Sequence, residues 1–291
     1  MSLDLGYQAL RSGAAWLDLS ARGRIVMRGR DRARLLHAIT TNEVKKMTAG
    51  TGCYAFLLNP QGRIQADLCL FCLEDHFLID TEAELREKVQ LLIKRYIIAD
   101  QVELEDVTAR TAAIGLEGPG AAAVLAALGA ASAEAAYAHA AWGDAMVAAV
   151  TVTGQPGARI FCPAEQAAGV VHRLEAAGAV EASAEDARLV RIENGKPRYG
   201  EDIRETSLPQ ETQQMHAVSF NKGCYLGQEI VERIRAQGRV NRKLMRVVLE
   251  GGEVPVAGTK TTVDGAEAEV TSAVVSPASG EVVALAYVRQ R

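Results

Sequence analysis

One short segment, residues 221–229 (Asn-Lys-Gly-Cys-Tyr-Leu-Gly-Gln-Glu), combines the residue types that thiol chemistry requires. Cys224 lies two residues after Lys222, with a glycine on either side of it at positions 223 and 227. A nearby cation favours the thiolate, which is the reactive form of cysteine, and glycine lets a ligand approach the backbone closely. The alternative is a tight turn in which the cysteine is a small buried hydrophobe.

A second candidate is a carboxylate in a predicted β-hairpin, residues 59–68. Strand alternation places Leu68 on the same face as Ile64, and Asp67 on the opposite face. If the Asp67 face lines a cavity, this carboxylate can bind a cationic or N–H-rich ligand. If that face meets water, Asp67 is an ordinary surface residue.

A third candidate, Glu193, is placed near the end of a helix that begins after Ser183, a residue type favoured at helix starts. The polar segment that follows, residues 196–220, is longer than an ordinary connection and is expected to be functional or ordered by a ligand. Beside that segment, Glu193 either contacts the amino groups of a ligand or simply pairs with Arg191.

A basic stripe follows the cysteine segment. In residues 232–246, six cationic side chains and one glutamate give a local charge of +5, whereas the whole chain carries −4. Such a stripe suits a polyanion, for example a polyglutamyl tail, a phosphate or an RNA backbone. The alternative is a solvated face between two domains. A tRNA-binding module would use interleaved aromatic residues for stacking, and this stripe has none.

Metal and membrane sites are not expected. Cys69 and Cys72 lie in a strand-like run, where a spacing of three puts them on opposite faces. No apolar run reaches the roughly 18 residues of a spanning helix, and the first residues do not resemble a secretory signal. Five cysteines do not make a disulfide framework, so free thiols in the cytoplasm are expected.

The elements that must position these residues predict an α+β fold. The order strand–helix–strands–helix occurs in residues 1–110 and again in residues 111–240, so each part is predicted to be an α+β domain. The second of these domains carries the cysteine segment, and an exchange of segments between the two is left open. Residues 241–291 contain short strands and glycine turns, which predict a small β-barrel or sandwich.

Residues 222–229 resemble the signature K-G-C-Y-x-G-Q-E of the YgfZ-type folate-binding proteins, which are relatives of the glycine cleavage T-protein (aminomethyltransferase). The resemblance extends over nearly the whole chain. Supporting segments are residues 35–37, 41–44, 57–59, 62–64, 191–195, 270–272 and 284–288.

This resemblance implies two ferredoxin-like α+β domains and a small C-terminal β-barrel around a central channel that binds tetrahydrofolate. It implies a role in the assembly or repair of iron–sulfur clusters and, through iron–sulfur enzymes, in tRNA modification. The partners would be iron–sulfur enzymes or cluster-assembly proteins, with tRNA involved only indirectly. The alternative is a folate-dependent transferase of methyl or aminomethyl groups, and whether the protein turns over a substrate is left open.

The resemblance also assigns site residues. Cys224, Lys222 and Asp67 would be catalytic, with Lys222 activating the thiol. The T-protein hairpin commonly has two adjacent acids; this chain has Ala66 and Asp67 at the corresponding positions, and the sequence does not decide which position corresponds to the catalytic one. The expected folate-binding residues are Asn42, Leu57, Asp67, Glu193, Lys222 and Tyr225.

Overall fold

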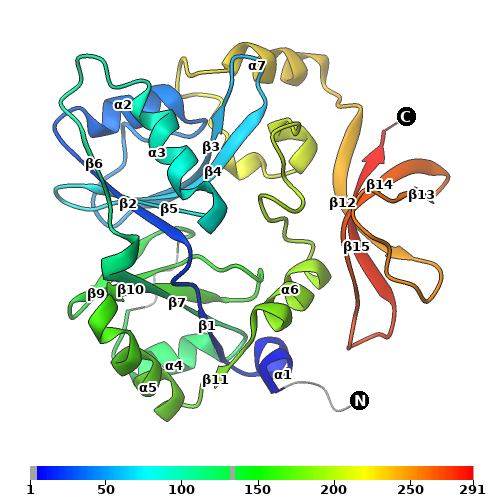
Figure 1. The fold of residues 1–291 in the computed structure, drawn as a ribbon, viewed down its shortest axis with the longest axis horizontal. Coiled ribbons are helices and arrows are strands. Elements are labelled where there is room, and N and C mark those ends of the chain that lie inside the picture. Colours follow the sequence, from blue (N-terminus) through cyan, green and yellow to red (C-terminus); the bar gives the residue numbers. More distant parts are fainter. Residues whose placement is uncertain (1–4, 132–134, 291) are drawn as a thin grey trace.

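The computed structural model describes residues 5–131 and 135–290. Figure 1 shows three β-sheets around the middle of the molecule: two lie one above the other, and the C-terminal sheet stands to their right. Among the described residues, no helix is both long and apolar enough to span a bilayer. The mixed α+β architecture predicted from the sequence is confirmed.

The first sheet has, in spatial order, strands β3 (Gly52–Leu58), β4 (Ile64–Cys72), β5 (Phe77–Thr81), β2 (Gly23–Arg28) and β6 (Glu103–Asp106). Helices α2 (Arg32–Ile39) and α3 (Arg86–Lys94) cover one of its faces. Leu36 of α2 and Val89 of α3 are fully buried in one cluster with Ile64 and Leu68 of β4. This cluster fixes the face of β4 that is turned away from Asp67, as the predicted alternation requires.

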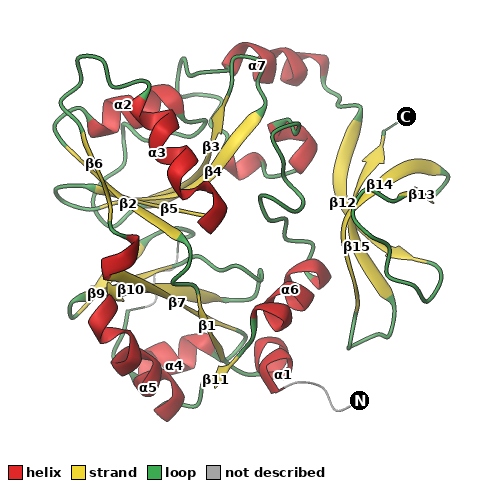
Figure 2. Ribbon diagram, in the orientation of Figure 1, coloured by secondary structure: helices red, strands yellow, loops and turns green. Residues whose placement is uncertain are grey.

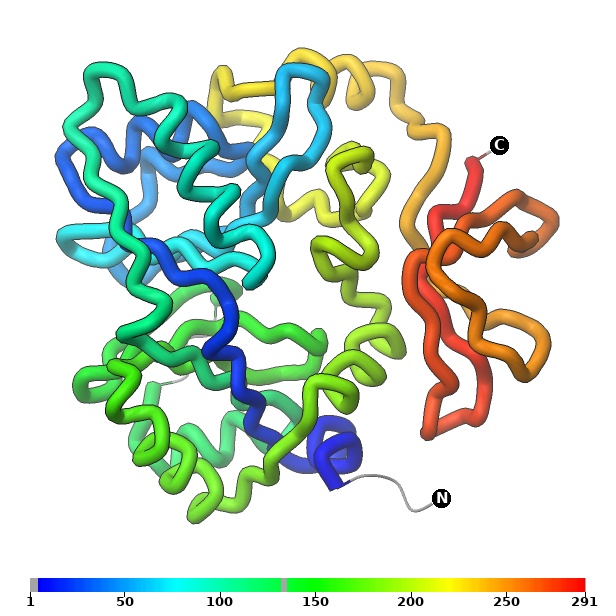
Figure 3. The backbone as a smooth tube through the Cα atoms, viewed as in Figure 1, coloured from blue at the N-terminus to red at the C-terminus, as the bar shows by residue number. Residues whose placement is uncertain are grey.

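The second sheet has, in spatial order, strands β11 (Val180–Glu181), β1 (Ala15–Asp18), β7 (Thr111–Glu117), β10 (Gly157–Pro163), β9 (Ala145–Ala148) and β8 (His139–Trp142). Helices α4 (Ala121–Ala127) and α5 (Ala167–Ala176) pack on it through an apolar cluster that includes Leu125, Leu174 and Ile160. Strand β1 comes from the start of the chain, which then crosses to the first sheet at β2. Figure 3 follows this crossing in blue.

The two larger sheets face each other, with their helices on the two outer sides (Figure 2). Between the sheets lies a separate apolar cluster, in which Phe71 of β4 is grouped with Ala113 of β7 and Phe161 of β10. Because residues two apart in a strand share a face, Asp67 points to the same side of β4 as Phe71. By the same rule, Arg159 points to the same side of β10 as Phe161. Asp67 and Arg159 therefore both enter the space between the sheets.

The chain from 184 to 237 connects these sheets to the C-terminal one. Helix α6 (Ala184–Glu193) begins with the predicted cap: the hydroxyl of Ser183 accepts a hydrogen bond from the backbone of Asp186, whose carboxylate accepts one from the backbone of Ser183. Helix α1 (Leu5–Ser12) packs beside α6. The segment after α6 forms two short 3-10 turns, η4 (Pro209–Thr212) and η5 (Met215–Ala217), before helix α7 (Gln228–Gln237).

The C-terminal sheet has, in spatial order, strands β12 (Arg242–Leu249), β15 (Val282–Arg289), β14 (Ala266–Val275) and β13 (Lys260–Val263). The predicted small β-barrel is not closed here: the described strands form an open sheet whose edges β12 and β13 do not pair. Four strands are too few to close a barrel with a filled interior. The sheet buries apolar surface by docking instead: Val274 and Val283 form a cluster with Ile192 of α6.

Candidate active site

A cavity of about 830 Å³ lies where the two facing sheets meet α6 and the segment that follows it. We call it the central cavity. The first sheet contributes strands β3 and β4 to its wall, and the second sheet contributes β1, β10 and the residues beside β11. Its lining includes Tyr54, Asp67, Arg159, Arg191, Lys196 and His216.

Asp67 is the carboxylate that the first sheet directs into the central cavity. Its neighbour Ala66 is fully buried on the opposite, helix-covered face of β4, so Asp67 is the hairpin residue that can meet a ligand. The hydroxyl of Tyr54 donates a hydrogen bond of 2.7 Å to Oδ2 of Asp67. The other oxygen, Oδ1, is buried and has no partner.

The electrostatics around Asp67 favour its protonated form. Burial is the largest cause, and the neighbouring Glu82 adds to it, so that the pKa of Asp67 is raised to about 6 even though Tyr54 and Arg22 act in the opposite direction. For Glu82, burial is outweighed by Arg22 and Arg198, which lower its pKa. Glu82 therefore stays ionised, whereas Asp67 can exchange a proton near neutral pH.

A buried ion network joins the two sheets beside Asp67. Arg22 donates to Asp80 from two nitrogens, at 3.1 Å (Nε) and 2.9 Å (Nη2), and its third nitrogen contacts Glu82. Arg159, from the second sheet, also donates to Asp80. Asp80 is the cross-strand partner of Cys69, which shares a face of β4 with Asp67. The network thus holds Arg159 of the second sheet against Asp80 of the first, although the two lie 79 positions apart.

Three rings form an aromatic part of the cavity wall. Tyr54 stacks on His216, with ring centroids 5.3 Å apart, and on Tyr137, at 6.3 Å. The hydroxyl of Tyr137 lies 3.3 Å from Nε2 of His216. Burial, and secondarily the charge of Lys196, lowers the pKa of His216, so this ring is neutral at physiological pH. The wall can therefore stack on a flat ring without adding a positive charge.

The segment after α6, predicted to be functional, lines the cavity with charged residues. Arg191 contacts Glu201 at 2.5 Å, and Arg198 contacts Glu82 at 3.0 Å. Lys196 donates to a backbone carbonyl at Thr151, and burial lowers its pKa. The sequence predicts no role in the site for these cations, except for Arg191 as a candidate ion-pair partner of Glu193. The three cations fall within residues 191–198, and this dense spacing is the sequence feature that could have indicated a place in the site.

The cysteine segment lies apart from the central cavity. Cys224 is exposed, but the ammonium group of Lys222 is directed away from solvent and donates to the backbone carbonyls of His37 and Thr40 at the end of α2. Burial lowers the pKa of Lys222 to about 8. In the part of the chain that the structure describes, no hydrogen bond joins Lys222 to Cys224. Lys222 therefore anchors the turn, and its predicted activation of the thiol has no support in these contacts.

Glu193 is not part of the cavity lining either. Its carboxylate accepts hydrogen bonds from Tyr7, at 2.8 Å, and from Ser276 of the C-terminal sheet, and Arg11 lies 3.7 Å away. It also does not pair with Arg191, the alternative considered from sequence, since Arg191 binds acids of the following segment. Glu193 therefore joins α1, α6 and the C-terminal sheet, and a contact with the pteridine stays a prediction.

The remaining predicted folate-binding residues have structural partners. The amide group of Asn42 donates to the backbone carbonyls of Tyr54, at 2.8 Å, and His216, at 2.9 Å, and so holds two parts of the cavity wall together. Leu57 is 4% exposed and belongs to the helix-covered core. Tyr225 is buried under the ammonium group of Lys222, which lies 4.9 Å from its ring centroid.

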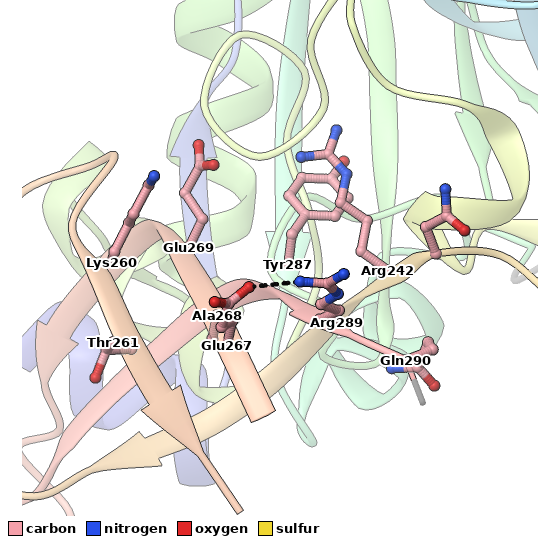
Figure 4. Close-up of a pocket in the computed structure, with 10 residues that line it drawn as sticks. Arg242, Lys260, Thr261, Glu267, Ala268, Glu269, Tyr287, Arg289 and Gln290 are labelled. Carbon is pink, nitrogen blue, oxygen red and sulfur yellow. Dashed lines mark hydrogen bonds and ion pairs between the residues drawn. The ribbon is translucent and has the colours of Figure 1, made fainter. Parts of the chain in front are cut away.

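The basic stripe does not line the central cavity. Its Arg242 lies over the ring of Tyr287, 4.4 Å from the centroid, in a second pocket of about 610 Å³ on the C-terminal sheet (Figure 4). In this pocket Arg289 pairs with Glu267 at 2.9 Å. No buried, unpartnered side-chain atom among the described residues lines this pocket. A ligand-binding role is therefore better supported for the central cavity.

Comparisons with known proteins agree with this architecture. The chain matches the GCVT N-terminal domain family over residues 4–222. It is 31% identical over 290 residues to the aminomethyltransferase of Rubrobacter xylanophilus, which covers 97% of this chain and 78% of that protein. The aminomethyltransferase of Thermus thermophilus is 31% identical over 294 residues, with 97% and 81% covered. The glycine cleavage system aminomethyltransferase T from Bartonella henselae shares the fold, with a TM-score of 0.86 over 98% of this chain and 80% of that one, at 22% identity.

Proposed function

The chain belongs to the GCVT N-terminal domain family, which is aminomethyltransferase-like, and on this premise we propose that it is a folate-dependent transferase of one-carbon groups. The observation that carries the proposal is Oδ1 of Asp67, a buried carboxylate oxygen without a partner at the wall of the central cavity. A buried acceptor of this kind is costly unless a ligand supplies a donor.

The central cavity suits tetrahydrofolate in size and chemistry. Its volume of about 830 Å³ lies within the range of small-molecule sites. The flat pteridine carries N–H donors for Asp67, and the neutral wall of Tyr54, Tyr137 and His216 can stack on a ring. When bound, the folate supplies the nitrogen that accepts the one-carbon group.

The chain's own residues would prepare this transfer. Ionised Asp67 stabilises a cationic donor amine, and protonated Asp67 can return a proton to the amine that leaves. Tyr54 fixes the orientation of the carboxylate through its hydrogen bond to Oδ2. Glu82, held ionised by Arg22 and Arg198, helps to keep the pKa of Asp67 near 6, where both forms of the carboxyl group are accessible.

Calorimetry with tetrahydrofolate tests the proposal. Wild-type protein is expected to bind, and Asp67→Asn is expected to bind at least about tenfold more weakly, because a charged hydrogen bond is worth roughly 1.5–3 kcal/mol. Asp106→Asn, which changes a carboxylate on the edge strand β6 outside the cavity, is the matched control. Wild-type protein that releases no heat of binding at millimolar tetrahydrofolate would contradict the proposal.

Exposed Cys224 favours a second candidate. We propose as the alternative that the chain is a YgfZ-type, cytoplasmic folate-binding protein that serves iron–sulfur enzymes, with tRNA modification as an indirect consequence. Its support is that a turn anchored by Lys222 presents the thiol at the surface. Complementation with Asp67→Asn and Cys224→Ala separates the two: loss only in Cys224→Ala favours the accessory role, and loss only in Asp67→Asn favours the transferase.

A further inference from the structure

A buried carboxylate outside the central cavity joins the C-terminal sheet to the segment that follows α6. Asp202 is fully buried and does not belong to the cavity lining. Its Oδ1 accepts hydrogen bonds of 2.6 Å from the hydroxyls of Thr271 and Ser272, both in β14. Its Oδ2 accepts hydrogen bonds from Nη1 of Arg191, at 2.5 Å, and from the backbone N–H of Arg198, at 3.0 Å. Each oxygen therefore binds one of two separate parts of the chain.

An irregularity in β14 makes the contact with both hydroxyls possible. Consecutive side chains of a regular strand point to opposite faces of the sheet, so neighbouring residues do not share one partner. The pairing of β14 with β15 shifts between Val270 and Ser272, and Thr271 is the extra residue of this bulge. Bulges redirect side chains and are over-represented beside active sites. Here the bulge turns two consecutive hydroxyls toward Asp202.

The turn that Asp202 fixes carries a cation of the cavity wall. Within residues 198–203, the backbone N–H of Asp202 donates to the carbonyl of Arg198 at 2.8 Å, while its carboxylate accepts from the N–H of the same arginine. Arg198 lines the cavity, and its Nη2 lies 3.0 Å from Oε2 of Glu82 and 2.7 Å from Oε1 of Glu84. Because a side chain moves with its backbone, the place of this guanidinium group depends on Asp202.

We infer that Asp202 is a positioning residue, through which the C-terminal sheet holds Arg198 against Glu82 at the wall of the central cavity. Glu82 in turn acts on Asp67, because it directly follows β5 and lies beside β4 in the register of these two strands. The inference rests on the proposed transferase function and deepens it. Part of the control over the Asp67 proton is assigned to a sheet that contributes no residue to the described cavity lining.

Loss of this anchor should make the pair of acids, Asp67 and Glu82, bind a proton more readily. The charged groups around the pair include Asp80, Glu84, Arg22, Arg159, Lys196 and Arg198. Burial keeps the nearby phenols and thiol neutral by raising the pKa values of Tyr54, Tyr137, Tyr199 and Cys69. When Arg198 moves away from Glu82, less positive charge remains beside the pair, and this favours its protonated form. The pH at which Asp67 takes up its proton should therefore rise.

The titration of Asp67 in the free, full-length protein tests the inference. NMR of protein labelled in its aspartate carboxyl carbons follows the proton, and the signal that is absent from Asp67→Asn identifies Asp67. Asp202→Ala and Asp202→Asn are the informative variants. Both remove the same charge, but the asparagine amide can still accept from Arg198 and donate to the hydroxyls of β14. Asp202→Ala is expected to titrate at least about 0.5 pH unit above Asp202→Asn, since a cation at close range lowers the pKa of an acid by about 1 or more.

A double variant of β14, Thr271→Val with Ser272→Ala, changes no charge, and it carries the test where Asp202→Ala does not fold. It is expected to raise the midpoint of the Asp67 titration by at least about 0.3 pH unit over wild type. Tyr287→Phe is the matched control, because it removes a hydroxyl of the same sheet that donates to the backbone carbonyl of Asp202, at 3.1 Å, and not to its carboxylate. This control should lower stability while the midpoint stays within about 0.1 pH unit of wild type.

Two results would overturn the inference. One is a midpoint in Asp202→Ala that equals that in Asp202→Asn, or a midpoint in the double variant that equals that in wild type. The other is a rise in Tyr287→Phe as large as that in the double variant, which would show that any loosening of the sheet moves the titration. Failure of tetrahydrofolate to bind wild-type protein would instead reject the proposed function, whereas the titration of the free protein would still report on Asp202.

Discussion

Replacing Asp67 by asparagine is expected to stabilise the folded protein at neutral pH while it weakens folate binding. In the fold, burial and Glu82 raise the pKa of Asp67 from its ordinary value of 3.8 to about 6. Above pH 6 the ionised side chain therefore opposes folding, by at most about 3 kcal/mol at 1.36 kcal/mol per pKa unit. Asparagine has no charge, and its side-chain oxygen can still accept the hydrogen bond from Tyr54.

The pH dependence has a definite sign. Below about pH 4 both the folded and the unfolded chain hold the proton, so wild type and Asp67→Asn should differ little. As the pH rises from 4 to 6, the unfolded chain releases this proton first, so the stability of wild type falls relative to the variant. Above pH 6 the difference is constant, and it corresponds to a rise in Tm of at most roughly 5 °C for the variant.

Urea unfolding and thermal melts of both proteins at several pH values between 4 and 8 measure this difference. Asp106→Asn is a control with the opposite sign. Although burial acts against ionisation there, hydrogen bonds from Thr108 and the charge of Arg86 prevail and lower the pKa of Asp106. That variant should lose stability at neutral pH and approach wild type in acid. An Asp67→Asn protein that is less stable than wild type at pH 7.5, or a difference independent of pH, would refute the reasoning.

Two further predictions concern the cysteine segment. Lys222→Met should leave the rate of Cys224 alkylation by iodoacetamide within about twofold of wild type, because the ammonium group contacts the end of α2; a tenfold loss of rate would show that the lysine activates the thiol. Gly227→Ala should lower the free energy of unfolding by more than about 2 kcal/mol, since a Cβ would lie 2.6 Å from the carbonyl oxygen of Asn59 at a φ of +81°. Gly223→Ala, at a φ of +90° but in open space, should cost only about 1 kcal/mol, and equal losses in the two urea titrations would contradict this account.

Local sequence patterns were enough to orient several site elements correctly. Alternation along residues 64–68 placed Asp67 opposite the apolar face of its strand, and the structure buries that apolar face under helices. Ser183 begins α6 as predicted. These features depend on the period of a strand and on the cap of a helix, which involve residues within a few positions of one another.

Tertiary structure alone determined how the charged side chains are used. Lys222 binds carbonyls at the end of α2, more than 180 positions earlier in the chain, instead of the neighbouring Cys224. Glu193 is engaged by Tyr7 and the C-terminal sheet. In the sequence, Arg159 lies in a strand without any functional signal. Only the docking of two sheets brings it into the lining of the cavity that also contains Asp67. A buried charged group pairs with the polar groups that lie next to it in the folded chain. Those neighbours are determined by the packing of elements that are distant in sequence.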